Sequence, residues 1–142
     1  MQSYTFDGYQ VKLNMNATTK WYAASDDWGC ECGDCQNFLE LAKKKELPER
    51  IITILDTLGI LPEKATCVSS LYTSEAGVLY QFSYRLAGTI VSVPDDPEAE
   101  NKNWVRCWHD PYPYGAPNFP EPHFDLEFYA ALPWVLDAAE NS

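Results

Sequence analysis

Basic residues are scarce in this sequence. It has 10 Lys and Arg against 21 Asp and Glu, so its net charge is −11. Clustered Lys and Arg neutralise phosphates and anionic lipids, and the charge balance therefore predicts no binding to nucleic acid or to a membrane surface. The same charge would speed the encounter with a basic protein partner. The alternative is that the surface charge serves solubility alone.

Long apolar runs and a leader segment are also missing. The chain has no stretch of about 18 apolar residues, the length needed to cross a bilayer. Residues 1–14 contain neither the basic region nor the apolar region of a signal peptide. We therefore expect a cytoplasmic protein, in which the five cysteines are thiols or metal ligands rather than disulfides.

Residues for the common catalytic arrangements are few. Histidine occurs only at His109 and His123, both in or beside a Pro-rich stretch, and no serine lies in a G-x-S-x-G motif. The seven glycines are scattered and form no phosphate-binding loop. These absences favour a non-enzymatic protein. A small hydrolase or a ligand-binding enzyme built under the Pro-rich loop is the least supported alternative.

Alternation of apolar and polar residues predicts a sheet. A chain of 142 residues with 46% hydrophobic residues predicts one domain, residues 1–142. Alternation predicts strands at 9–16 and 18–25, joined as a hairpin. Further strands are expected within 66–93, with a turn at 74–77 and a bend at Gly88, at 104–109, and at 124–132. In the last strand Asp125 and Glu127 fall on the polar face, where we expect a solvated surface.

Two helices interrupt the strands. A period of 3.6 residues predicts one helix at about 34–45 and a second at about 48–58, which Gly59 would end. Residues 94–122 hold seven of the ten prolines and are predicted to be mostly loop, and 132–139 a short turn or helix. The predicted class is α+β, an antiparallel sheet with the two helices packed on one face.

The stretch WGCECGDCQNF, residues 28–38, places Cys30, Cys32 and Cys35 at the start of the first helix. One reading is a structural zinc site, which needs about four Cys or His ligands. The fourth ligand would have to come from a distant residue: Cys67, Cys107, His109 or His123. A redox site is a second reading, although the nearby acidic residues would raise the thiol pKa values. The third is that the cysteines are small apolar residues packed into a turn.

Three stretches resemble a family of small bacterial proteins of no known function. They are WGCECGDCQNF, LPERIITILDTLGILPEKA and LEFYAALPWVL. The family shares a C-x-C-x-x-C-x-N-F/Y motif, an L-G-I-x-P-x-K turn and an L-P-W-V-L ending. The resemblance implies the same architecture and implies that Cys30, Cys32, Cys35 and Asn37 act as a unit. It carries over no catalytic residue.

Function is therefore open between two main hypotheses. The first is a non-enzymatic acidic protein of the cytoplasm that binds a basic protein partner, as immunity proteins and antitoxins do. The second is a metalloprotein that uses the cysteine cluster for a structural zinc ion. The first requires no cofactor, and the second requires Zn.

Overall fold

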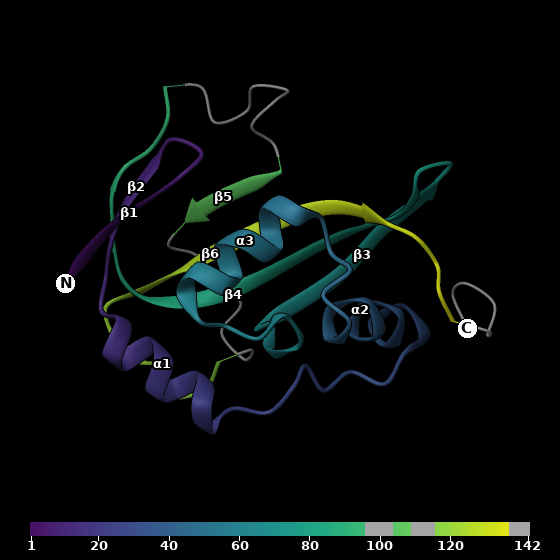
Figure 1. The fold of residues 1–142 in the computed structure, drawn as a ribbon, viewed down its shortest axis with the longest axis horizontal. Helices are drawn as coiled ribbons and strands as arrows, with labels where there is room; N and C mark the ends of the chain where they lie inside the picture. The colour runs from purple at the N-terminus through teal and green to yellow at the C-terminus, as the bar shows by residue number, and fades with distance from the viewer. Residues whose placement is uncertain (96–103, 109–115, 137–142) are drawn as a thin grey trace.

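The computed structural model describes residues 1–95, 104–108 and 116–136 (Figure 1). Within these residues the chain forms an antiparallel sheet and three α-helices, so the predicted α+β class is confirmed. The elements in chain order are β1 (Gln2–Phe6), β2 (Tyr9–Leu13), α1 (Met15–Ala24), α2 (Gly33–Lys43), α3 (Glu49–Leu58), the 3₁₀ turn η1 (Pro62–Lys64), β3 (Cys67–Ser74), β4 (Gly77–Ser92), β5 (Val105–Trp108) and β6 (His123–Leu132).

Strand β4 is the centre of the sheet. The strand order is β1-β2-β4-β6-β5, and β3 also pairs with β4. The first part of β4 pairs with β3 and β6, and from Gly88 onward it pairs with β2. Gly88 has a φ of 149°, and a Cβ there would collide with the carbonyl oxygen of Lys12. Only glycine fits this crossing, which is where the sequence predicted a bend.

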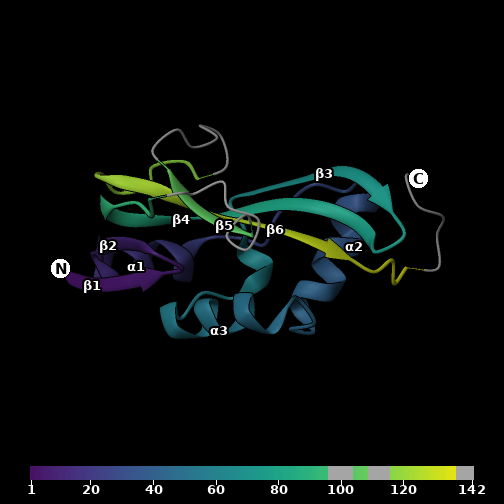
Figure 2. The ribbon, with the colours of Figure 1, turned by 90° about the horizontal axis from the view of Figure 1, so that it is seen from above.

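The helices α2 and α3 lie on one side of the layer made by β3, β4, β5 and β6 (Figure 2). Phe38 of α2 packs against Phe82 of β4, with ring centroids 4.9 Å apart. Helix α3 buries Ile51, Leu55 and Leu58 and ends at Gly59, whose φ of 70° is left-handed as expected of a helix-ending glycine. Both predicted helices, and their place on one face of the sheet, are confirmed.

The predicted hairpin of 9–16 with 18–25 is wrong. Residues Met15–Ala24 form helix α1, and the partner of β2 is the unpredicted strand β1. A turn at Asp7 and Gly8, both with positive φ, joins β1 to β2. The helix begins because the Asn14 side chain accepts a hydrogen bond from the backbone N–H of Ala17 (3.1 Å).

Tertiary contacts explain why α1 is a helix. Thr18 and Tyr22, four residues apart on one helix face, are its buried residues. Thr18 Oγ1 accepts a hydrogen bond from the backbone N–H of Ala87 (3.0 Å). The hydroxyl of Tyr22 donates to the backbone carbonyl of Arg85 (2.8 Å). Both partners lie on β4, so the alternation that suggested a strand is overridden by contacts more than 60 residues away in sequence.

Some of the remaining predictions are confirmed, and others fall on residues outside the described part of the chain. The turn at 74–77 joins β3 to β4, and strands are confirmed at 105–108 and 123–132. Parts of the Pro-rich loop, 96–103 and 109–115, and the chain end, 137–142, lie outside the described residues, and so does His109. Residues 133–136 form no helix or strand. None of the described helices is long and apolar enough to span a membrane.

Candidate metal centre

The three clustered cysteines come together in space. The Sγ atoms of Cys30, Cys32 and Cys35 all lie within 4.8 Å of one another. Those of Cys30 and Cys32 are 3.4 Å apart. Cys32 is exposed, Cys30 is partly buried and Cys35 is buried, so the group lies at the surface with one side in the core. Such a group could hold a metal ion.

The start of α2 determines this arrangement. Cys32 is the N-cap residue, and its Sγ accepts a hydrogen bond from the backbone N–H of Cys35 (3.4 Å). An N-cap residue and the third helical residue share one end of the helix, which brings these two sulfurs together. The Gln36 side chain then donates to the backbone carbonyl of Cys30 (2.9 Å) and holds the preceding segment over the same helix end.

Trp28 supports the cluster from the other side. Its indole Nε1–H donates to Cys35 Sγ (3.2 Å). Its backbone N–H donates to the carbonyl of Glu63 in η1 (2.9 Å). Hydrogen bonds from N–H groups favour a sulfur that carries negative charge. The indole therefore fixes Cys35 and favours its thiolate.

The thiols differ in acidity. Burial raises the pKa of Cys35 to about 12, although the hydrogen bond from Trp28 acts in the opposite direction. The backbone N–H of Cys32, followed by the neighbouring sulfurs, lowers the pKa of Cys30. In the metal-free protein Cys35 therefore carries its proton at neutral pH. A bound cation would have to displace that proton, because the thiolate is the metal ligand.

The four candidates for a fourth ligand are not part of this group among the described residues. Cys107 lies on β5, at the opposite edge of the sheet from β3, and is buried. Cys67 pairs with Ser83 on the sheet face opposite α2. His123 begins β6, with Nδ1 3.1 Å from the carbonyl oxygen of Pro120. His109 lies outside the described part of the chain. The described site thus offers three protein ligands.

Asn37 has a different position from the cysteines. It is fully buried, and its side chain donates to the carbonyl of Pro133 (3.0 Å) and accepts from the backbone N–H of Val135 (2.8 Å). Asn37 therefore ties the LPWVL stretch to α2, while Trp28 ties the cysteine segment to the LPEK turn. The three stretches that carry the family resemblance meet around the first turns of α2.

No protein-family model, curated protein or solved structure matches the chain. The chemistry of the site therefore rests on its own residues.

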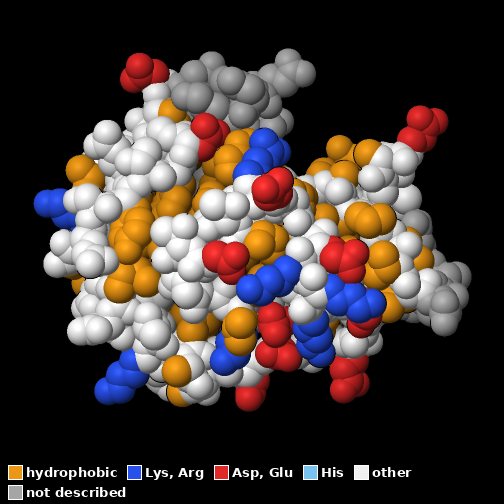
Figure 3. All heavy atoms as spheres, in the orientation of Figure 1, with side chains coloured by type: hydrophobic (Ala, Val, Ile, Leu, Met, Phe, Trp, Pro, Cys, Tyr) orange, Lys and Arg blue, Asp and Glu red, His pale blue; other side chains and the backbone are white. Residues whose placement is uncertain are grey.

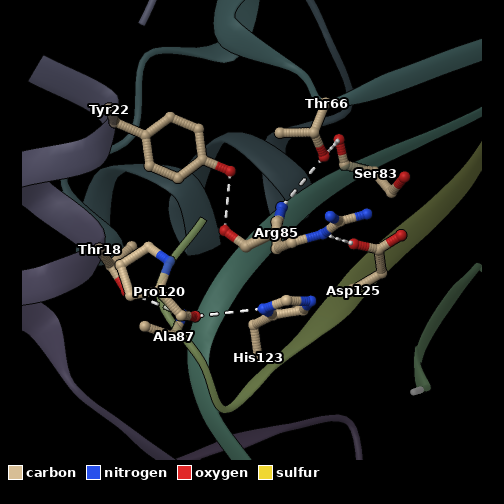
Figure 4. Close-up of polar contacts among 9 residues, drawn as sticks. All are labelled: Thr18, Tyr22, Thr66, Ser83, Arg85, Ala87, Pro120, His123 and Asp125. Atoms are coloured by element: carbon tan, nitrogen blue, oxygen red, sulfur yellow. Dashed lines mark hydrogen bonds and ion pairs between the residues drawn. The ribbon is translucent and has the colours of Figure 1, made fainter. Parts of the chain in front are cut away.

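A second polar cluster lies on the sheet face opposite the helices, and it corrects the expectation for Asp125 and Glu127. Both are buried, with 3% of their surface exposed. Asp125 accepts from Arg85 Nε (3.1 Å), as Figure 4 shows, and Glu127 accepts from Arg106 Nε (2.8 Å). Each arginine lies directly opposite its carboxylate in the strand register. The sequence contains both arginines, but recognising them as the partners of the two carboxylates requires knowledge of the strand register.

This second cluster is saturated with partners. Burial raises the pKa of Asp125, and the Arg85 guanidinium opposes that shift. The Arg85 backbone N–H donates to Thr66 Oγ1 (3.1 Å) and its carbonyl accepts from Tyr22 (Figure 4). The Tyr129 hydroxyl donates to Glu127 (2.7 Å). Groups engaged in this way hold strands and α1 together and offer little to a ligand.

Proposed function

We propose that the protein binds one zinc ion through Cys30, Cys32 and Cys35. The observation that carries the proposal is the mutual approach of the three sulfurs to within 4.8 Å. Tetrahedral zinc with Zn–S bonds of about 2.3 Å keeps its sulfurs about 3.8 Å apart, so small shifts would seat the ion. Thiolates are soft ligands, which favours Zn²⁺ or Cu⁺ over Mg²⁺ or Ca²⁺.

The role that fits this position is structural, with the fourth zinc position filled by water or by a residue outside the described part of the chain. Residues 25–31 form neither helix nor strand and connect α1 to α2. An ion bound to Cys30 and Cys35 would fasten this connection to the first turn of α2. Because metal sites rarely exist in the unfolded chain, the binding free energy would add to folding stability.

The test is metal analysis of protein purified without a histidine tag. We expect about one zinc atom per chain, and loss of most of it in Cys32→Ser, because Cys32 is an exposed ligand whose replacement disturbs no core packing. The matched control is Cys67→Ser, which changes a cysteine outside the group and should keep the zinc. Absence of metal from the parent protein, or equal metal in Cys32→Ser, would refute the proposal.

The second candidate function is binding of a basic protein, in the manner of an immunity protein or antitoxin. The observation that favours it is the net charge of −11 together with the uneven distribution of the exposed charges. Over α2 and α3, basic and acidic side chains are interspersed (Figure 3), as in the pairs Lys44–Glu40 and Lys45–Asp56. Residues 26–31, in contrast, carry three exposed carboxylates, Asp26, Asp27 and Glu31.

The second function predicts a basic protein partner whose complex with this chain dissociates as the salt concentration rises. A basic protein captured from lysate should be identifiable, and its binding should be reproduced with the purified pair. Raising the salt concentration from about 0.05 to 0.5 M should weaken a complex steered by exposed charge, because the Debye length shortens. A neighbouring gene for a toxin-like protein would support the antitoxin form. Capture that does not depend on salt would count against it.

A further inference from the structure

A pocket of about 580 Å³ lies beside the cysteine cluster, between α1, the segment that follows it and η1. This volume is within the range of small-molecule sites, about 300–1,000 Å³. The residues that decide its chemistry are Trp21, Asp26, Asp27, Trp28, Cys30 and Lys64. These side chains bring two indoles, two carboxylates, one thiol and one ammonium group to the pocket.

The two indoles are held in place and offer their rings. Trp21 donates from Nε1 to the carbonyl of Pro117 (3.1 Å) and packs against Tyr22 and Phe119, with centroid distances of 5.0 and 4.9 Å. Trp28 donates from Nε1 to Cys35. Both side chains remain partly exposed. Since both N–H groups are already used, the rings can offer a ligand π surface and apolar contact.

The charge of the pocket is negative. Asp26 and Asp27 are exposed. Within the described part of the chain the only ion pair of either is between Asp27 Oδ2 and Lys43 Nζ, which are 4.0 Å apart. The Lys64 ammonium donates to the backbone carbonyl of Tyr22 (2.7 Å), near the C-terminal end of α1. Within the described residues, the one ammonium group of the lining pairs with neither of the two carboxylates, so the lining keeps a net negative charge.

We propose that this pocket binds an organic cation: an ammonium or guanidinium group carried on a flat or aliphatic body. The body contacts Trp21 and Trp28, and the charge is balanced by Asp26 and Asp27. Attraction between a cation and an indole face adds to the attraction of the carboxylates, and a neutral molecule of the same shape gains neither. The pocket shares Cys30 with the proposed zinc site, but the contacts to the cation do not require zinc, so the proposal is testable on metal-free protein. Two sources share this chemistry, an arginine side chain of a basic partner and a free amine.

The test uses probes that are matched in shape and differ in charge. One set is benzylammonium, benzyl alcohol and benzoate; the other is N-acetylarginine amide and N-acetylcitrulline amide. Binding is followed by the indole Nε1–H signals in ¹H–¹⁵N NMR spectra, assigned with Trp21→Phe and Trp28→Phe. We expect saturable shifts of these two signals with a cation, and at least about fivefold weaker binding of its neutral counterpart. Tighter binding of the arginine amide identifies a protein side chain as the source, and tighter binding of benzylammonium identifies a free amine.

Charge variants complete the test. The double variant Asp26→Asn, Asp27→Asn should weaken cation binding about three- to tenfold, because two exposed carboxylates are lost. The control Glu46→Gln, Glu75→Gln removes the same charge at two exposed positions outside the pocket and should leave the affinity unchanged. Equal binding of neutral probes, an unchanged affinity in the Asp26 and Asp27 variant, or the absence of any saturable shift at these indoles would overturn the proposal.

Discussion

The cysteine cluster and the Arg85–Asp125 cluster differ in how far their groups are satisfied. In the second cluster, buried carboxylates face arginines directly across the strands. Tyr129 of β6 also donates to Glu127, and Tyr22 of α1 donates to the backbone carbonyl of Arg85. In the first, three sulfurs lie close together at a helix end, where Cys35 accepts from the Trp28 indole and Cys32 accepts from the Cys35 backbone N–H. Saturated groups of this kind stabilise the fold. The three sulfurs form a group that could hold a metal ion, which is the basis of the proposed zinc site.

The largest effect on stability is expected for Arg85→Met. The variant leaves Asp125 buried without its ion-pair partner, and both side chains are only 4% exposed in the parent protein. Loss of one member of a buried pair costs about 3–5 kcal/mol, so the free energy of unfolding in urea should fall by that amount. Zinc content should not change in the fraction that folds. As a control, Lys20→Met removes a positive charge at an exposed position and should cost less than about 1 kcal/mol.

A small effect of Arg85→Met would mean that water or another group satisfies Asp125. The double variant Arg85→Met, Asp125→Leu separates the explanations, because removing both charges should restore much of the lost stability. If the double variant is as unstable as the single one, packing rather than the unpaired carboxylate is responsible.

The second prediction concerns zinc and stability. A ligand that binds only the folded state at 100 times its Kd stabilises by about 2.7 kcal/mol. Saturating zinc should therefore raise the Tm of the parent protein and of Cys67→Ser, and should leave the Tm of Cys32→Ser nearly unchanged. Differential scanning calorimetry with zinc and with a chelator measures both. A zinc effect that survives Cys32→Ser would place the ion elsewhere in the chain.

The sequence could predict features that neighbouring residues determine, but not those that depend on contacts between residues far apart in the chain. The cysteine group was predictable because Cys32 and Cys35 are brought together by one helix start, and Gly59 because it ends its own helix. Helix α1 was not, because Tyr22 and Thr18 take partners on β4. The burial of Asp125 was missed for the same reason, since its arginine lies 40 residues away in sequence. A fourth metal ligand would likewise depend on tertiary structure.

The third prediction is a pH dependence of zinc affinity. Burial raises the pKa of Cys35 to about 12, so the metal-free protein holds this proton at neutral pH. Zinc binding must release it, and the affinity should rise with pH. The expected slope is at least about tenfold per pH unit between pH 6 and 8, or about 1.4 kcal/mol per unit. Competition with a chelator of known pH dependence gives the slope, and a flat profile would exclude Cys35 as a thiolate ligand.

The raised pKa of Cys35 also predicts how the folding stability of the metal-free protein depends on pH. Because the folded pKa of Cys35 is raised above the ordinary thiol value of 9.0, it contributes stability that is present below pH 9 and is lost as the pH rises toward 12. Zinc-loaded protein already has the thiolate at Cys35 and should not show this part of the loss. Cys107, whose pKa burial also raises to about 12, contributes equally with and without zinc, so the difference between the two samples isolates the cluster.

The smallest expected effect concerns Asp34. It is next to the cysteine cluster in sequence, but its side chain contacts the sheet. It is in the first turn of α2, among the cysteines in sequence, yet its Oδ2 accepts a hydrogen bond from Ser70 Oγ of β3 (2.6 Å). Its Oδ1 is buried and has no hydrogen-bond partner among the described residues. Asp34 is also absent from the sulfur group. We therefore assign it to the fold, as a link between α2 and the edge strand β3.

Ser70→Ala tests that assignment. The variant should lower the free energy of unfolding by about 1 kcal/mol, the usual value of one hydrogen bond to a side chain, and should leave the zinc content unchanged. Ser3→Ala, an exposed serine on β1, is the matched control and should have a smaller effect. If Ser70→Ala instead changes zinc affinity, the Asp34 carboxylate acts on the ion through the helix start. In that case the residues that influence the proposed zinc site would extend from the first turn of α2 to β3.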